Sequence, residues 1–229
     1  MSINNKPQFI TFEGGEGCGK STQSRLLYQY LLSKKIPAIH TREIGGTHEA
    51  EKIRSVVIHS NLKSTSELLL IMAARYEHIN QVIIPALLKG HWVICDRFID
   101  STACYQSNKL GIDIDEIYKL HKRLIVYEDL HLKDVDNAML NFYSIPIKGI
   151  MPDITFFIDV APNIALRRAK KRGNNNKFEE KQKKFHDSVY RNFKKITSLY
   201  SNRIVSVNTR NKNINQIQQF IREYLFNEA

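Results

Sequence analysis

The stretch that decides the fold is residues 9–22, which read FITFEGGEGCGKST. Its first four residues, FITF, form a short apolar run that is typical of a strand buried on both faces. The eight residues from Gly14 to Ser21 match the pattern G-x-x-x-x-G-K-[ST], and Thr22 follows. An amphipathic helical pattern follows, from about Lys20 to Leu32. A strand, a glycine-rich loop and a helix in this order predict a binding site for the phosphates of a nucleoside triphosphate.

Each residue type in this loop has a physical task. Glycines let the backbone turn its N–H groups inward around a polyphosphate, and the helix N-terminus adds partial positive charge. We expect Lys20 to reach the terminal phosphates and the Ser21 hydroxyl to be a ligand of Mg²⁺. Cys18 lies beside Lys20, which favours either a reactive thiol of lowered pKa or a small spectator residue. The ATP-binding candidates are Gly14, Gly15, Glu16, Gly17, Cys18, Gly19, Lys20, Ser21 and Thr22.

Outward from the loop, short apolar runs alternate with helical patterns. Strands are predicted at 37–40, 92–95, 154–158 and 204–207, and the longest helical pattern covers 66–88, while the last covers about 214–226. This alternation predicts an α/β protein with a five-stranded parallel sheet and helices on both faces, the three-layer P-loop NTPase fold. Ligands of such folds bind beyond the carboxyl ends of the strands, so the residues that follow each strand are the candidates for function.

Two segments interrupt this alternation. Residues 127–148 mix acids, aromatics and a proline without a clear period, and we interpret them as an insertion without an assigned role. Residues 167–184 contain nine Lys and Arg around a Gly-Asn-Asn-Asn stretch. This cluster indicates either a solvated helix face or a mobile basic lid over about 170–182. The chain, residues 1–229, is interpreted as a single domain.

Charge and hydropathy narrow the function classes. The chain has 34 Lys and Arg against 23 Asp and Glu, a net charge of +11, which predicts polyanionic partners. No apolar run reaches 18 residues, so no membrane span or membrane partner is expected. The N-terminus lacks an apolar signal core, which favours a cytoplasmic protein with three reduced cysteines. A nucleic-acid-binding ATPase remains an alternative on charge alone.

A second group of candidates follows the predicted strand 92–95. Asp96 stands at the strand tip, where Mg²⁺ and its waters are usually held, and Arg97 can place a guanidinium between two phosphates. On a following helix, Ser101, Thr102, Tyr105 and Gln106 would lie on one side. Hydroxyl, amide and ring groups on one face can read a nucleobase, and the alternative is a polar surface.

Five blocks together carry a family resemblance: FEGGEGCGKST, TREIGGT, AEKIRS, MAARYEH and DRFIDSTACYQ. In this order they resemble bacterial thymidylate kinases, closely over residues 8–126 and more loosely over 149–226. The resemblance implies a nucleoside monophosphate kinase fold and transfer of the ATP γ-phosphoryl to dTMP, giving dTDP and ADP for dTTP synthesis. It also implies Mg²⁺ dependence, a homodimer, and a lid that closes over ATP.

The resemblance also implies a role for individual residues. Glu43 would lie near the dTMP phosphate, Arg54 would contact it, and Arg75 would hydrogen-bond thymine. Tyr105 would pack under the sugar and disfavour a 2′-hydroxyl. The catalytic set would be Lys20, Arg97, Arg172 from the lid, and Glu16, with Ser21 and Asp96 at the metal. The dTMP-binding set would be Glu43, Arg54, Ile71, Arg75, Arg97, Ser101, Thr102, Tyr105 and Gln106.

Three positions depart from the family pattern. Ile44 replaces a proline, Ile71 replaces an aromatic residue that stacks on thymine, and Lys177 replaces a lid arginine. A kinase with a broader pyrimidine range that includes dUMP stays an alternative, because the thymine methyl group contributes only about 1 kcal/mol to discrimination between dTMP and dUMP.

Overall fold

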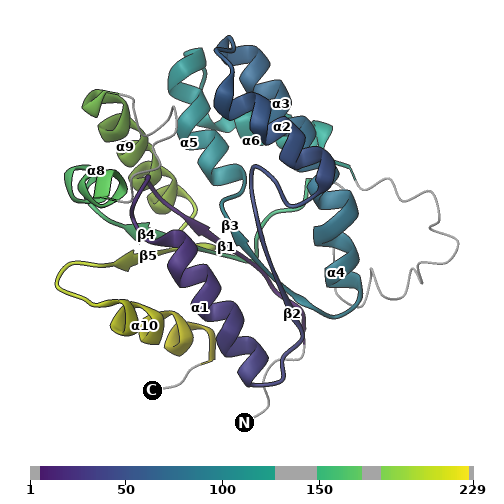
Figure 1. Cartoon of the computed structure of the whole chain (residues 1–229), viewed down its shortest axis with the longest axis vertical. Coiled ribbons are helices and arrows are strands. Elements are labelled where there is room, and N and C mark those ends of the chain that lie inside the picture. Colours follow the sequence, from purple (N-terminus) through teal and green to yellow (C-terminus); the bar gives the residue numbers. More distant parts are fainter. Residues whose placement is uncertain (1–5, 127–148, 172–181, 227–229) are drawn as a thin grey trace, which may run out of the picture.

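A parallel five-stranded sheet lies at the centre of the computed structural model, which describes residues 6–126, 149–171 and 182–226. The strands are β1 (Phe9–Glu13), β2 (Ala38–Arg42), β3 (Trp92–Asp96), β4 (Ile154–Asp159) and β5 (Ile204–Asn208). Their order is β2-β3-β1-β4-β5, and every neighbouring pair is parallel. The predicted α/β fold and its five strands are confirmed, and β1 with its loop occupies the middle of the sheet (Figure 1).

Helices cover both faces of the sheet, giving three layers (Figure 1). One face packs against α1 (Lys20–Ser33) and α10 (Ile214–Phe226). The other packs against α3 (Ser64–His78), α4 (Ile84–Leu88), α5 (Ile99–Leu110), α6 (Ile114–Leu124) and α9 (Lys183–Leu199). Helix α2 (His48–His59) packs on α3, and α8 (Pro162–Lys171) packs on α9.

Side chains of β1 alternate between two hydrophobic cores. Ile10 and Phe12 lie in the core under α1 and α10, whereas Phe9 lies in the opposite core, edge-on to Phe98. Both cores are fully buried, which is why the strand reads as a continuous apolar run instead of an alternating one.

The long helical pattern over 66–88 is not one α-helix. Helix α3 ends at His78, a π-helical turn covers Ile79–Ile83, and α4 begins at Ile84. Pro85 explains the interruption, because it has no N–H and its ring would clash with the carbonyl four residues earlier. The Asn80 amide donates to the carbonyl of Tyr76 at 3.0 Å and thereby satisfies one acceptor at the break.

Strands end in polar residues that the sequence prediction placed just outside them: Glu13, Arg42, Asp96, Asp159 and Asn208. These ends share one edge of the sheet because the strands are parallel. The predicted insertion 127–148 lies outside the described residues, as does most of the predicted lid, whose described part is residues 170, 171 and 182. Within the described ranges, no helix is both long and apolar enough to cross a membrane.

Candidate active site

Two adjoining cavities open at the carboxyl edge of the sheet. The larger has a volume of about 900 Å³ and follows the glycine-rich loop, while the smaller, of about 120 Å³, lies between α3 and α5. Four residues line both cavities: Glu16, Glu43, Arg54 and Arg97. The boundary between the two cavities is therefore made of charged side chains of both signs.

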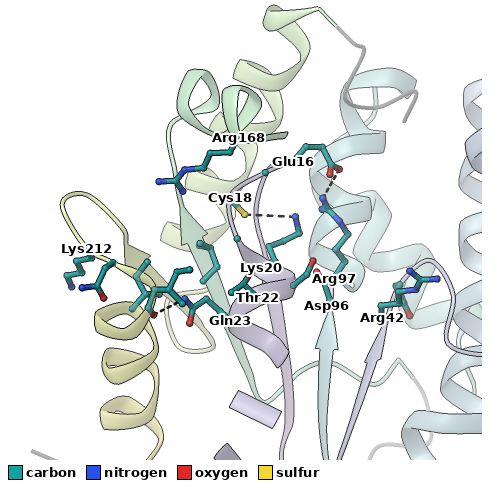
Figure 2. A pocket seen from close by; sticks show the side chains of 18 of the residues that line it. Glu16, Cys18, Lys20, Thr22, Gln23, Arg42, Asp96, Arg97, Arg168 and Lys212 are labelled. Atoms are coloured by element: carbon teal, nitrogen blue, oxygen red, sulfur yellow. Dashed lines mark hydrogen bonds and ion pairs between the residues drawn. The ribbon is translucent and has the colours of Figure 1, made fainter. Parts of the chain in front are cut away.

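The glycine-rich loop forms one wall of the larger cavity (Figure 2). Residues Glu16 to Thr22 line it, whereas Gly14 and Gly15 present their carbonyl oxygens to Arg97 and to Lys20, at 3.1 and 3.0 Å. Gly19 caps α1 with φ of 105°, a conformation that glycine adopts without strain. The loop has the arrangement that its sequence predicted, with Lys20 at the floor of the cavity.

Gly17 is required by packing against a helix. A Cβ atom at this position would lie 2.0 Å from the carbonyl oxygen of Ala165 and 3.0 Å from the nitrogen of Ala169, both in α8. The backbone of the loop thus lies directly against α8, with no room for a side chain between them.

The thiol of Cys18 has a raised pKa, which contradicts the alternative of a reactive thiol. Burial raises the pKa of Cys18, although the Lys20 ammonium lies 4.0 Å from the sulfur and acts in the opposite direction. Cys18 is only 3% exposed and packs in the core beneath α1. The spectator interpretation of this cysteine fits its surroundings.

Arg97 lies at the boundary of the two cavities. Its Nη2 donates to Glu16 Oε1 at 2.7 Å, while its Nη1 donates to Ser101 Oγ at 2.8 Å and to Gly14 O. Burial alone would lower the pKa of Arg97, but Glu16, with smaller contributions from Tyr105 and Asp96, holds that pKa above its usual value. Burial alone would raise the pKa of Glu16, and Arg97 and Lys20 reverse this and lower it. Both partners are therefore charged at neutral pH.

Asp96 provides a carboxylate beside Arg97 (Figure 2). Its Oδ1 atom is buried and has no hydrogen-bond partner within the described part of the chain. Ser21 is exposed in the same cavity. An orphaned carboxylate oxygen and a hydroxyl are hard ligands suited to Mg²⁺.

All nine residues of the predicted dTMP-binding set line the smaller cavity: Glu43, Arg54, Ile71, Arg75, Arg97, Ser101, Thr102, Tyr105 and Gln106. Four of them come from one side of α5, as the helical spacing predicted. Arg54 donates to the carbonyl of Ile44 at 2.9 Å, and the Glu43–Ile44 peptide bond is cis.

The floor of this cavity is a buried ion pair. Arg75 is 1% exposed; its Nε donates to Glu43 Oε2 and its Nη2 to Thr102 Oγ1, each at 2.7 Å. Burial alone would raise the pKa of Glu43, but the charge of Arg75 lowers it. His78 contacts Glu43 Oε1 at 3.3 Å and Thr41 Oγ1 at 2.6 Å. The sequence prediction missed His78, although it is the last residue of the quoted MAARYEH block.

A second buried group orients Gln106. Its Nε2 donates to Glu67 Oε1 at 2.8 Å, and Lys109 donates to the same oxygen at 2.5 Å. The amide oxygen of Gln106 is buried without a partner among the described residues. The hydrogen bond to Glu67 therefore fixes the orientation of the Gln106 amide and leaves its oxygen available to a ligand.

Most of the far end of the larger cavity was not predicted, although Arg168 belongs to the predicted basic cluster over residues 167–184. This end is lined by Arg168 of α8 and by residues 212–215 and 217, around the start of α10 (Figure 2). Gln23 donates to the carbonyl of Ile214 at 3.1 Å and joins this segment to α1. Because the segment follows β5, the rule for strand ends would have found it. Arg172 and Lys177 lie outside the described residues.

A triphosphate loop, a buried lysine and a charged boundary to a second, smaller cavity define a P-loop phosphotransferase. Comparison with known proteins identifies the family within this class. The family model for thymidylate kinase matches residues 12–138 and 125–221. The chain belongs to the thymidylate kinase family, whose members are ATP-dependent nucleoside monophosphate kinases.

Curated relatives and a solved structure agree with this assignment. A thymidylate kinase of Rickettsia africae (strain ESF-5) is 45% identical over 225 residues, which cover 97% of this chain and 100% of the relative. A thymidylate kinase of Rickettsia bellii (strain RML369-C) is 44% identical, covering 98% of each. The crystal structure of thymidylate kinase from Ehrlichia chaffeensis matches with a TM-score of 0.66 at 31% identity, covering 96% of this chain and 98% of that one.

Proposed function

We propose that this chain transfers the γ-phosphoryl group of ATP to dTMP, giving dTDP and ADP. The observation that carries the proposal is the shared boundary of the two cavities. A triphosphate on the loop and a monophosphate in the smaller cavity meet there, at Arg97 and Glu16. Family membership supports the same pair of substrates.

The chemistry needs positioning and charge neutralisation more than a strong base. A phosphate oxygen of dTMP is already a nucleophile at neutral pH, and transfer proceeds without a covalent enzyme intermediate. Lys20, Arg97 and Arg172 neutralise the transferring group, while Glu16 and Glu43 orient the cations around it. The raised pKa of Arg97 keeps its charge throughout the working pH range.

Mg²⁺ belongs to the proposed function, and the residues present fit it. Asp96 and Ser21 would hold the ion, which when bound neutralises phosphate charge. Mg²⁺ binds through one or two protein ligands together with waters and substrate phosphates. The lack of a cluster of three metal-binding side chains among the described residues agrees with this mode.

The nucleoside of dTMP occupies the smaller cavity in this proposal. Gln106, Thr102 and Arg75 face the base edge, Ile71 covers the base, and Tyr105 lies under the sugar. Because Arg75 already bonds Glu43 and Thr102, its guanidinium is held in place before a ligand arrives. Preorganised polar groups of this kind discriminate better than mobile ones.

The proposal also covers the domain organisation, the location and the oligomeric state of the protein. Residues 1–229 form one kinase domain whose lid, at about 170–182, closes over ATP and excludes water. The protein is cytoplasmic and acts as a homodimer without nucleic acid. Exposed apolar side chains on α2 and α3, Val56 and Leu69, supply surface for dimer contact. Sedimentation at micromolar concentration tests the dimer, and a monomer at all concentrations would exclude it.

A coupled assay of ADP release with dTMP, dUMP, dCMP and dAMP tests the activity. We expect the highest kcat/KM with dTMP, loss of turnover without Mg²⁺, and little ADP release without an acceptor. Equal rates with dUMP would establish the broader pyrimidine kinase instead. ADP release that needs DNA and no monophosphate would overturn the proposal.

A further inference from the structure

A buried carboxylate at the end of β1 holds the start of another element. Glu13 is 0% exposed. Its Oε1 accepts from the backbone N–H groups of Phe98 and Ser101, at 2.7 and 3.1 Å. Its Oε2 accepts from the Ser101 hydroxyl at 2.5 Å. Three donors of one short segment therefore converge on one carboxylate.

This carboxylate does the work of a helix cap. The first N–H groups of a helix have no partner within the helix, and negative charge near them is favourable. Phe98 occupies the capping position of α5, and no capping side-chain bond comes from that residue itself. Glu13 supplies the missing acceptor from a strand that lies 85 residues earlier in the chain.

The capped segment carries Arg97. This residue has a positive φ of 72°, a conformation that is unfavourable for a side chain larger than glycine. Its Nη1 donates both to Gly14, the residue after Glu13, and to Ser101, which Glu13 also binds. The end of β1 thus fixes the backbone after Arg97 and one arm of its guanidinium at the same time.

We propose that Glu13 is a positioning residue that holds Arg97 in register with the phosphate-binding loop. Glu13 lines neither cavity, so it acts through Arg97 and Ser101 and does not touch a substrate. The inference rests on the proposed function, because it takes Arg97 as the group that bridges the donor and acceptor phosphates.

The surroundings of Glu13 argue against a purely stabilising role. Burial and the nearby Asp100 raise the pKa of Glu13 to about 7, while Arg97 acts in the opposite direction. Asp100 has its own cation, Arg203, at 2.7 Å. A buried carboxylate without such a dedicated cation is unfavourable for folding, so its three hydrogen bonds are more readily explained by the geometry that they impose.

The test compares Glu13→Ala and Glu13→Gln with Asp100→Asn, a matched control. Asp100 is the neighbouring buried carboxylate, and it accepts hydrogen bonds from Tyr118, Thr155 and Arg203. We expect Glu13→Ala to lower kcat by about 10²-fold with KM for ATP and dTMP changed by less than about threefold. Glu13→Gln keeps one acceptor oxygen and recovers part of kcat, whereas Asp100→Asn lowers stability and leaves kcat near the wild-type value.

A double variant shows whether Glu13 acts through Arg97. If it does, Glu13→Ala has little further effect on kcat in an Arg97→Ala background. Fully additive losses, or a folded Glu13→Ala or Glu13→Gln enzyme with wild-type kcat, would overturn the inference. Should Glu13→Ala not fold, the Glu13→Gln variant and its double variant decide the same question. The proposed function fails separately, if the wild-type enzyme does not phosphorylate dTMP or if Arg97→Ala leaves kcat unchanged.

Discussion

The two cavities that meet at Arg97 are built in different ways. The larger, about 900 Å³, is walled by the glycine-rich loop and by side chains from several other segments, which come from both halves of the chain. The smaller, about 120 Å³, is lined by side chains that form hydrogen bonds with one another. They also form hydrogen bonds with buried residues behind them, such as Glu67 and His78. A loop of backbone groups binds any polyphosphate, whereas fixed side chains select one shape. We therefore expect mutations in the larger cavity mainly to lower kcat, and mutations in the smaller cavity mainly to change selectivity.

The largest expected effect comes from the loop side of this comparison. Lys20→Met should lower kcat by roughly 10³-fold or more, because it removes a buried cation from the transferring phosphate. Steady-state kinetics measure the loss. Lys89→Met, at an exposed lysine, is the control and should leave kcat unchanged. A Lys20→Met enzyme within tenfold of wild type would mean that the loop does not hold the reacting phosphate.

The next effect comes from the buried pair of the smaller cavity. Glu43→Ala leaves the Arg75 charge buried without its carboxylate, so we expect the free energy of unfolding to fall by about 3–5 kcal/mol. Urea denaturation measures it. Glu116→Ala removes half of an exposed pair and should change stability little. Adding Arg75→Met to Glu43→Ala should recover much of the loss, and failure to do so would show that the pair is not the cause.

Glu13, which is buried behind Arg97 and lines neither cavity, has a raised pKa, and this predicts an effect of pH on stability. Its folded pKa of about 7 lies above the ordinary 4.5, so the folded state binds this proton more tightly. The Glu13 contribution is then present below about pH 4.5 and is lost as pH rises through about 7, by on the order of 3 kcal/mol. Glu16 and Glu43 have lowered pKa values, so their contributions are lost as pH falls instead. The difference between wild type and Glu13→Gln, measured by denaturation from pH 5 to 8, isolates the Glu13 contribution. A difference that stays constant over this range would contradict it.

The smallest effect concerns selectivity within the smaller cavity. One methyl group separates dTMP from dUMP, which corresponds to about 1 kcal/mol, or roughly fivefold in kcat/KM. Competition between the two acceptors measures the ratio. Ile71→Ala, which removes the side chain that covers the base, should bring the ratio closer to one. An unchanged ratio would show that the thymine methyl group does not contact Ile71.

Local patterns predicted the fold well. The five strands and the loop were predicted because buried parallel strands read as apolar runs and because the loop pattern is specific. The break at Ile79–Ile83 was missed, since apolar periodicity alone does not distinguish a π turn from an α turn.

The site was predicted less completely, because several of its features depend on contacts between distant segments. The nine predicted dTMP-binding residues all line the smaller cavity, but the sequence did not show that Arg75 is already held by Glu43. Residues 212–215 carry no phosphate pattern, and only their place after β5 indicates that they lie near the loop. Glu13 was overlooked because its partners lie on α5. The sequence left two alternatives for Cys18, because burial of the thiol, which raises its pKa, depends on packing that the sequence pattern does not show.

The contact between Gly17 and α8 has a consequence for evolution and for engineering. Glycine is required there because backbone atoms of Ala165 and Ala169 leave no room for a Cβ atom, and both alanine side chains are themselves buried, so the packing of α8 constrains the position of the loop. A bulkier residue at either alanine should displace the loop and weaken nucleotide affinity without altering any atom that meets the nucleotide. Variants selected for resistance to ATP-competitive compounds could therefore arise in a helix that an inhibitor never touches.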